Sequence, residues 1–372
     1  MSRPLSPPAP ASAERMILTS GGFADWLAAQ EVSLALTTYQ AGRLFFIGRK
    51  PDGGLRAHER LIEHCQGLWT DGSDLWTSGK HMLWRFRNDL EQGRTTERGA
   101  DRRFVPREGR VTGAIDIHDI GVGDTGGGAR GPIFAATAFN CLATISDTAS
   151  FRTLWRPPFI TATAGEDRCH LNGLAMDGDR PAFVTAVSRS DVADGWRDRR
   201  RDGGVIVDVA SGEIAASGLS MPHSPRLRDG RLWLLNSGRG ELGWVDPADG
   251  AFTPVAFCPG YARGLAFAGR YAVIGLSRPR RNHTFEGLEL DERLARADAI
   301  ARCGLLIVDV ETGRSTEWLR FEHTIDELYD VAVLPGVAQA EAVGFRGEDI
   351  ERVVTAEEQG AGPKSILDES GK

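Results

Sequence analysis

Short apolar runs, separated by polar turns rich in glycine and aspartate, make up most of this chain. A turn of the form Asp-x-x-x-Gly lies between two such runs at residues 208–212, 246–250 and 309–313. Runs of this kind, with turn residues at both ends, are typical of β-strands. A strand, turn, strand unit that recurs every ~40 to 50 residues is typical of β-propeller blades. The pattern therefore predicts an all-β fold, a single closed β-propeller.

Helical periodicity is scarce along the chain. We predict a short N-terminal helix over residues 22–31, and the next helical pattern appears only at residues 288–301. The polar, proline-rich residues 1–16 and the polar, glycine-rich residues 355–372 are expected to be disordered. This assigns the propeller domain to residues 17–354.

The number of blades follows from the number of innermost strands. The clearest unit is a strand, a polar turn and a second strand that ends in a small polar residue. Innermost strands are expected to begin near Ala35, Gln66, His118, Asn172, His223, Arg263 and Tyr329. Seven such strands predict seven blades. The first unit, however, is one strand short, and terminal strands commonly share a blade to close a ring. Six blades with a shared closing blade is the alternative.

The charge balance and the termini narrow the range of partners. The chain has 44 Lys and Arg against 51 Asp and Glu, a net charge of -7, and nucleic-acid binding requires a basic face. No apolar window approaches the ~18 residues that a membrane span requires. Residues 1–16 lack an apolar signal segment, and the five cysteines form no CxxC pair. We therefore expect a cytoplasmic protein with no nucleic-acid or membrane partner.

Several longer strings carry a resemblance to a known family. These are LWRPPFI (154–160), CHLNGLAM (169–176), GLSMPHSPR (218–226), GELGWVDP (240–247) and LYDVAVLPG (328–336). On these strings the chain resembles an uncharacterised bacterial family of conserved hypothetical proteins, a domain of unknown function with propeller-like repeats. The resemblance covers roughly residues 17–354. It implies the propeller fold and no activity.

Histidines supply the candidate chemistry. Alignment of the repeats places one polar or aromatic residue of each at the same level of the channel: Gln66, His118, Asn172, His223, Arg263 and Tyr329. His170 lies two residues before Asn172, hence on the same strand face. The imidazoles of His118, His170 and His223 could together hold a divalent transition metal as cofactor. Structural hydrogen bonds to neighbouring blades are the alternative role for each histidine.

Charged residues extend this candidate site. Asp116 and Asp119 flank His118 and could act as ligand, orienting group or general base, and Glu327 is a second candidate base. Arg263 is suited to capture of a carboxylate or phosphate, whereas Arg226 is better explained by an intramolecular salt bridge.

Two functional classes follow. The first is a metal-dependent enzyme that acts on a small-molecule substrate at the channel mouth, with Asp119, Glu327 and Arg263 as its catalytic residues. The second is a non-catalytic propeller scaffold that binds a protein or peptide partner, in which the histidines are structural. The glycine-rich segment 121–128 lacks the lysine and the helix of a phosphate-binding loop, so a nucleotide site there is not expected.

Overall fold

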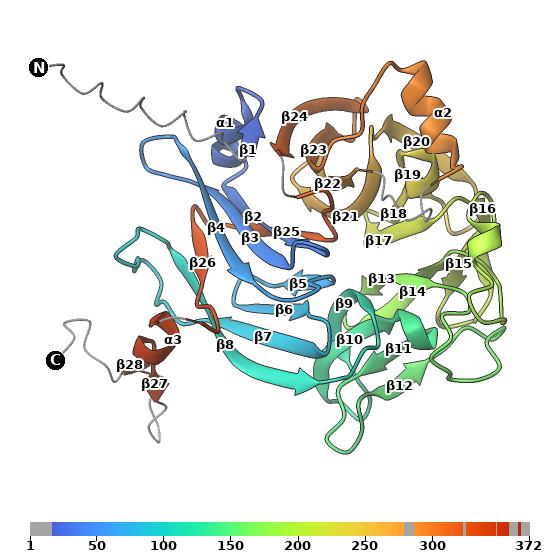
Figure 1. Ribbon diagram of the computed structural model, residues 1–372, viewed down its shortest axis with the longest axis horizontal. Helices are drawn as coiled ribbons and strands as arrows, with labels where there is room; N and C mark the ends of the chain where they lie inside the picture. Colours follow the sequence, from blue (N-terminus) through green and yellow to red (C-terminus); the bar gives the residue numbers. More distant parts are fainter. Residues whose placement is uncertain (1–16, 279–285, 323–324, 347, 357–363, 366–372) are drawn as a thin grey trace, which may run out of the picture.

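Six β-sheets form a closed ring in the computed structural model of the protein, which describes residues 17–278, 286–322, 325–346, 348–356 and 364–365 (Figure 1). The innermost strand of each sheet lies beside the innermost strands of both neighbours. Strand β25 (Val331–Pro335), for example, lies between β5 (Leu68–Thr70) and β21 (Tyr261–Ala268). The predicted all-β, closed β-propeller is therefore confirmed.

The sheets are numbered here as blades 1 to 6, each described from its innermost strand outward. Blade 1 consists of β25, β2 (Val32–Thr38), β3 (Arg43–Arg49) and β4 (Leu55–Leu61). Blade 2 consists of β5, β6 (Asp74–Ser78), β7 (Met82–Asn88), β8 (Arg102–Val111) and β26 (Ala340–Ala342). Blade 3 consists of β9 (Ile117–Asp124), β10 (Arg130–Ala136), β11 (Cys141–Thr144) and β12 (Arg152–Trp155). Blade 4 consists of β13 (Leu171–Asp177), β14 (Arg180–Ala186), β15 (Gly204–Asp208) and β16 (Ile214–Leu219). Blade 5 consists of β17 (Pro222–Arg228), β18 (Arg231–Asn236), β19 (Glu241–Val245) and β20 (Phe252–Phe257). Blade 6 consists of β21, β22 (Tyr271–Ser277), β23 (Gly304–Asp309), β24 (Arg314–Phe321) and β1 (Ile17–Thr19).

The number of blades is six, the alternative in the sequence prediction, and not the seven that its strand count favoured. Ala35 does not begin an innermost strand, because it lies in β2 and pairs with Ala332 of β25. The N-terminal and C-terminal units thus form one blade, in which the C-terminal strand is innermost. The N-terminal strand β1 also pairs with β24 of blade 6. Both joints hide strand edges and close the ring.

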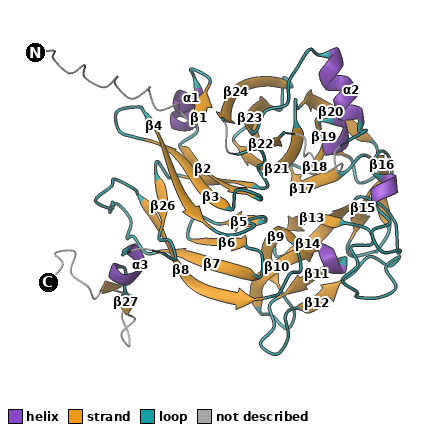
Figure 2. Ribbon diagram, in the orientation of Figure 1, coloured by secondary structure: helices purple, strands orange, loops and turns teal. Residues whose placement is uncertain are grey.

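Helices are few and peripheral (Figure 2). The predicted N-terminal helix is α1 (Phe23–Ala29), and its Phe23, Trp26 and Leu27 pack against strands of blades 1 and 6. Two further helices, α2 (Glu289–Arg296) and α3 (Asp349–Arg352), and three short 3-10 turns, η1 (Thr137–Phe139), η2 (Arg197–Arg199) and η3 (Ser237–Arg239), lie in connections between strands or after β26.

The predicted disordered lead, residues 1–16, and most of the predicted tail lie outside the described residues. Within the tail, β27 (Thr355–Ala356) pairs with β28 (Lys364–Ser365).

The recurrent Asp-x-x-x-Gly turn connects the third and fourth strands of blades 4, 5 and 6. In each copy the glycine N–H donates to the aspartate carbonyl, at 2.8 to 2.9 Å. The glycines at 212, 250 and 313 all have φ near +70°, a conformation that other residues rarely adopt. The motif is therefore a backbone requirement of this turn.

The small polar residue at the end of each second strand joins neighbouring blades. In five of the six blades its hydroxyl group donates to a carbonyl at the start of the next blade's innermost strand. The bonds are Thr37 to Gln66, Ser78 to Ile117, Thr137 to Leu171, Ser237 to Ala262 and Ser277 to Leu328, with distances of 2.5 to 3.0 Å. This ring of hydroxyl groups fixes the level at which each innermost strand begins.

Candidate functional site

One residue near the start of each innermost strand occupies an equivalent place in all six blades. These residues are polar or aromatic, and each is at most 7% exposed. We call them the strand ring, which consists, in blade order, of Tyr329, Gln66, His118, Asn172, His223 and Arg263. They are the residues that the repeat alignment predicted at one level. Because buried polar groups require partners, their contacts define what this end of the channel can do.

A second set, two residues earlier in each blade, forms the mouth ring: Glu327, His64, Asp116, His170, Met221 and Tyr261. Four of these residues, His64, Asp116, His170 and Met221, have φ between +47° and +58°. A positive φ is uncommon in residues other than glycine, and here it turns the chain sharply into the innermost strand. His170 therefore precedes β13 rather than lying within it.

The two rings are joined by contacts that pass from one blade to the next. The strand-ring residue of a blade meets the mouth-ring residue of the following blade in four of the six cases. These pairs are Gln66 with Asp116 (2.7 Å), His118 with His170 (ring centroids 5.0 Å apart), His223 with Tyr261 (5.7 Å) and Arg263 with Glu327 (2.6 Å). Residues from all six blades thus take part in these four contacts.

His170 is held by a carboxylate and an indole. Its Nδ1 lies 3.0 and 2.9 Å from the two carboxylate oxygens of Asp167, and its ring stacks on Trp196 at 4.2 Å. The indole Nε1 of Trp196 donates to the same carboxylate at 2.8 Å. Burial alone would raise the pKa of Asp167, but His170 and the two hydrogen bonds outweigh it and hold that pKa below its ordinary value. Asp167 is therefore an anion that orients the imidazole.

His118 lies edge-on to His170 and is neutral at physiological pH. Burial lowers the pKa of His118 to about 4, with His170 and Arg263 adding to the effect and Asp116 opposing it. Its Nδ1 lies 3.1 Å from the carbonyl oxygen of Asp116 and 3.6 Å from that residue's carboxylate. The Asp116 side chain is 40% exposed, so solvent reaches the site at this point.

His223 belongs to the same cluster but is fixed differently. Its Nδ1 lies 2.9 Å from the carbonyl of Met221, and its Nε2 lies 3.3 Å from the amide nitrogen of Asn172. Burial, reinforced by the nearby Arg263, holds the pKa of His223 well below its ordinary value. His223 is therefore neutral and accepts a hydrogen bond through Nε2.

Arg263 and Glu327 form a buried ion pair beside the histidines. Their side chains are 5% and 2% exposed, and Arg263 Nη1 donates to Glu327 at 2.6 Å. The guanidinium also lies over the rings of Tyr261 and Tyr329, at 5.0 and 4.9 Å. Tyr329 in turn lies edge-on to His118 at 5.2 Å. Arg263 and Glu327, both predicted from the sequence as site residues, therefore contact each other next to the imidazoles.

Asp119 is not among the side chains that the structure brings to the imidazoles. Neighbouring residues on a strand point to opposite faces, and the Asp119 carboxylate accepts the N–H groups of Ile120 and Leu174, both at 3.0 Å. It also accepts a 2.8 Å bond from Arg226 Nη1. This salt bridge is the role that the sequence favoured for Arg226, and it occupies the carboxylate that was a candidate base.

Arg226 connects its own blade with four others. From blade 5 it reaches Asp119 in blade 3, Asp330 in blade 1 at 3.7 Å, and the carbonyl groups of Leu174 and Leu265 in blades 4 and 6. Asp330 accepts the N–H groups of Leu68 and Val331. Burial, with the nearby Asp119, raises the pKa of Asp330 to about 7. We call this cluster of Arg226, Asp119 and Asp330 the ionic plug.

Glycine follows the strand-ring residue in alternate blades. After the strand-ring residue come Asp330, Asp119 and Ser224 in blades 1, 3 and 5, and Gly67, Gly173 and Gly264 in blades 2, 4 and 6. A methyl group on Gly264 would lie 2.7 Å from the backbone nitrogen of Val331 and 2.8 Å from Cα of Asp330. Each of these three glycines lets the innermost strand of the following blade approach closely.

The described residues contain no group of three histidine, cysteine, aspartate or glutamate side chains arranged to hold a metal ion. His118 and His170 lie together, whereas His223 Nε2 faces Asn172. All three, however, have Nδ1 next to an oxygen acceptor, the arrangement that leaves Nε2 available in metal-ligating histidines. The expected metal site thus stays a prediction.

Sequence reasoning missed Asp167 and Trp196. Asp167 lies three residues before His170, and Trp196 belongs to the connection between β14 and β15. Neither falls within a repeat unit, so no repeat alignment could place it. Cys169, beside His170 in the sequence, is fully buried, and burial raises the pKa of its thiol. It forms no dyad with His170.

The fold and this mouth define a closed six-bladed β-propeller whose channel is lined by histidine and carboxylate groups at one end. The family model described as Domain of unknown function (DUF4915) matches residues 21–343, and the chain belongs to this family. The resemblance to a family of unknown function is thereby confirmed. No curated protein matches the chain.

Two solved structures match the chain over most of its length. A chain of the crystal structure of a nidogen/laminin complex is 11% identical, with a TM-score of 0.51, and the match covers 82% of this chain and 99% of that one. A protein of unknown function from Bacteroides caccae is 10% identical, with a TM-score of 0.46, and the match covers 81% and 98%. At such identity the first likeness concerns the fold alone. Within the described parts of the chain, no helix is long and apolar enough to cross a membrane.

Proposed function

We propose that the channel mouth binds a small polar molecule and acts on it by proton transfer, with His170 as the general base. The observation that carries this proposal is the contact of His170 Nδ1 with both carboxylate oxygens of Asp167, at 3.0 and 2.9 Å. A carboxylate at Nδ1 fixes the tautomer in which Nε2 carries the lone pair, and it stabilises the imidazolium that forms when Nε2 takes a proton. The substrate's acidic proton would therefore meet His170 Nε2.

The neighbouring side chains supply polarity of both signs. His118, neutral because of its lowered pKa, offers an uncharged imidazole at 5.0 Å from the ring of His170. Arg263 and Glu327 offer a buried guanidinium and carboxylate. In a site shielded from water, such fixed charges interact strongly with a polar ligand. These roles differ from the sequence hypothesis chiefly in the base, which is His170 rather than Asp119 or Glu327.

A divalent transition metal is the second candidate for the same place. It is favoured by the oxygen acceptor beside Nδ1 of His118, His170 and His223, which would leave three Nε2 atoms as ligands. His223 would first have to release Asn172. Elemental analysis of the purified protein and of His223→Ala, each after reconstitution with zinc, iron(II), copper and manganese, tests this. Metal bound by the wild type and lost in the variant supports a metal site, and a metal-free wild type overturns it.

Hydrolysis of p-nitrophenyl acetate tests the proposed base. This small activated ester reports any imidazole that can remove a proton from water or attack the carbonyl group. We expect His170→Gln to lower the protein-dependent rate by about tenfold or more, because general-base catalysis contributes on this scale. The matched control is His81→Gln, since His81 is an exposed histidine outside the mouth.

Equal rates for the two variants would contradict the proposal. With a metal-free wild type, that result would favour the alternative of a scaffold that binds a protein or peptide partner and whose histidines are structural.

A further inference from the structure

A large groove lies between blades 1 and 2, away from the channel histidines. Its volume is about 1170 Å³, and residues 59–64, 79–82 and 344–346 form much of its wall. Ligand pockets in proteins typically have volumes of ~300 to 1,000 Å³, so a small molecule fits. The groove includes His64, whose ring lies 4.8 Å from Tyr39, but none of the three histidines of the channel cluster.

One part of the groove is apolar and aromatic. Trp84 and Phe345 both line it, with ring centroids 4.2 Å apart, and Phe345 stays 38% exposed. Leu61, at the end of β4, also lines the groove and is 54% exposed. Exposed large apolar side chains that gather in one concave place are typical of binding sites. A flat apolar group would lie against Trp84 and Phe345.

The rest of the groove is positively charged. Its lining includes five cationic side chains, Arg43, Arg60, Lys80, Arg98 and Arg346, against three carboxylates, those of Glu59, Glu63 and Asp349. The whole chain has a net charge of -7, so the groove has the opposite sign to the molecule around it. A concave surface lined by one sign of charge attracts ligands of the other.

The positive charge is only partly compensated. Asp349 serves two guanidinium groups, those of Arg60 at 3.1 Å and Arg98 at 3.6 Å. Burial and the nearby Arg98 lower the pKa of Arg60, against the effect of Asp349. Arg346 makes no ion pair with any residue in the described part of the chain. An added anion would therefore stabilise the positive charges of Arg60, Arg98 and Arg346.

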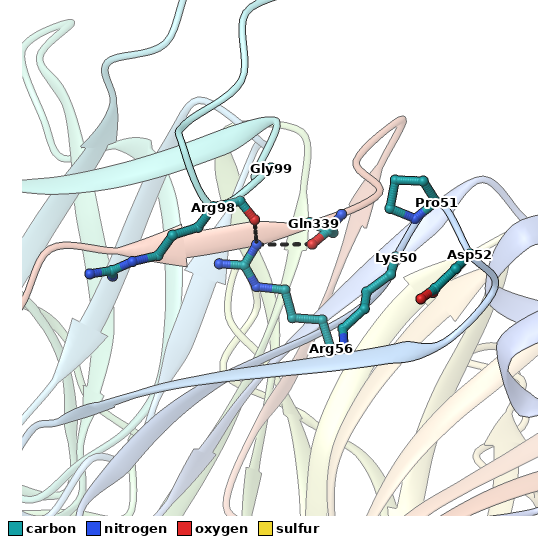
Figure 3. A pocket seen from close by; sticks show the side chains of 7 residues that line it. All are labelled: Lys50, Pro51, Asp52, Arg56, Arg98, Gly99 and Gln339. Atoms are coloured by element: carbon teal, nitrogen blue, oxygen red, sulfur yellow. Dashed lines mark hydrogen bonds between the residues drawn. The ribbon is translucent and has the colours of Figure 1, made fainter.

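The arginines are held in place by the backbone around them. A methyl group on Gly344 would come within 2.8 Å of Arg60 Cδ, so glycine leaves room for that side chain beside Phe345 and Arg346. The carbonyl of Arg98 accepts a 2.5 Å bond from Arg56, which also donates to Gln339 (Figure 3). Figure 3 shows the Arg98 side chain pointing away from Arg56, and its guanidinium lies 3.6 Å from Asp349.

We propose that this groove binds a small aromatic anion, such as an aromatic carboxylate. The aromatic body would lie against Trp84 and Phe345, and the anionic group would meet Arg346 together with Arg60 and Arg98. The groove shares His64 with the mouth ring but none of the three channel histidines, and this proposal does not rest on the proton-transfer function proposed for the mouth. Aromatic stacking and charge-assisted hydrogen bonds would each contribute to affinity.

Calorimetric titration with three probes of one shape tests the proposal. The probes are 2-naphthoate, the neutral 2-naphthylmethanol and the cationic 2-naphthylmethylammonium. We expect 2-naphthoate to bind with a 1:1 stoichiometry, about tenfold or more tighter than the alcohol, and to weaken as salt screens the charges. Phe345→Ala should weaken all aromatic binding, whereas Arg346→Ala should weaken the naphthoate and leave the alcohol unchanged. The matched control is Arg314→Ala, an exposed arginine on β24.

The proposal fails if the naphthoate does not bind, or if the alcohol and the cation bind as tightly as the naphthoate. It also fails if Arg346→Ala and Arg314→Ala behave alike. Folding of each variant is checked by its melting temperature, and both arginines are exposed, so neither change should unfold the protein. His170→Gln should leave naphthoate binding unchanged, which separates this site from the channel mouth.

Discussion

The imidazole Nδ1 of His170 lies 2.9 Å from the nearer carboxylate oxygen of Asp167, across a turn in which both residues have positive φ. Trp196 completes the arrangement, because it donates to the same carboxylate and stacks on the imidazole. Three contacts therefore fix the ring of His170 at the channel mouth, next to His118. A left-handed backbone in residues other than glycine costs free energy, and here it serves to present these two side chains together.

Asp167→Asn should separate this orienting role from folding. An asparagine can accept from Trp196 or from His170 but lacks the charge that stabilises an imidazolium. We expect the protein-dependent hydrolysis of p-nitrophenyl acetate to fall by about tenfold or more, with a smaller effect on the melting temperature. Asp194→Asn, an exposed aspartate paired with Arg197 on the following connection, is the control and should keep the wild-type rate. An unchanged rate in Asp167→Asn would remove Asp167 from the proposed mechanism.

Acid should destabilise the protein before most carboxylates are protonated. The pKa values of His58 and His118 are lowered to about 4, chiefly by burial, and that of His223 is also lowered. These histidines stay neutral in the folded protein while the unfolded chain takes up protons below pH ~6.5. Each therefore lowers the free energy of unfolding by about 1.4 kcal/mol per pH unit as the pH falls from ~6.5 towards its folded pKa.

Urea denaturation at pH 7 and pH 5 measures this loss, and His58→Gln should reduce it. Equal stability at the two pH values would show that these histidines are not held neutral by the fold. Asp330, whose pKa is raised to about 7, has the opposite effect on the free energy of unfolding as the pH falls, but it is one group against three histidines.

The ionic plug should respond to pH through Asp330. Burial raises the pKa of Asp330 to about 7, so the folded protein holds a proton there that the unfolded chain has lost above pH ~4. The contribution of Asp330 to stability therefore falls as the pH rises from ~4 to ~7 and is constant above. The free energy of unfolding of the wild type minus that of Asp330→Asn should decline over this interval. A difference that does not change with pH would mean that Asp330 ionises normally.

The ring of hydroxyl groups should contribute measurably to stability. Thr137→Ala removes a 2.6 Å bond and leaves the buried carbonyl of Leu171 without this donor. Loss of a partner from a buried polar group costs about 1 to 3 kcal/mol, and Thr137→Ser should recover most of it because the hydroxyl is kept. Thr148→Ala, in an exposed turn, should change the free energy of unfolding by less than about 0.5 kcal/mol. Urea denaturation of the three variants decides, and a Thr137→Ala protein as stable as the wild type would contradict the structural role.

Much of the fold could be predicted because each blade repeats the same local chemistry. The Asp-x-x-x-Gly turn requires a left-handed glycine, and the small polar strand ends bind the next blade. The blade count could not be decided in this way, because Ala35 and Tyr329 each begin a segment that resembles an innermost strand, although the first unit is one strand short. Only the pairing of β2 with β25 shows that the two units belong to one blade.

The candidate site was predictable where it follows the repeat and not elsewhere. His118, His223 and Arg263 lie where the alignment placed them. Asp119 does not meet His118, since neighbours on a strand face opposite ways and Arg226 takes its carboxylate. Asp167 contacts His170 because both residues adopt a left-handed backbone conformation. The sequence does not indicate such a conformation at residues other than glycine.

Histidine-specific modification by diethyl pyrocarbonate tests most directly whether the channel mouth is a chemical site. The reagent is a small molecule that acylates neutral imidazoles at an available ring nitrogen, and peptide mass spectrometry resolves the rate at each histidine. We predict that exposed His81 reacts first and that His170, whose Nδ1 lies against Asp167 and leaves Nε2 available, follows in the folded protein. The Nε2 atom of His58 lies 3.1 Å from the backbone nitrogen of Ala342 and 3.1 Å from its carbonyl oxygen. His58 should therefore stay unmodified until the protein unfolds. If His170 proves as inert as His58, the mouth is a sealed structural cluster and the proposed proton-transfer function is wrong.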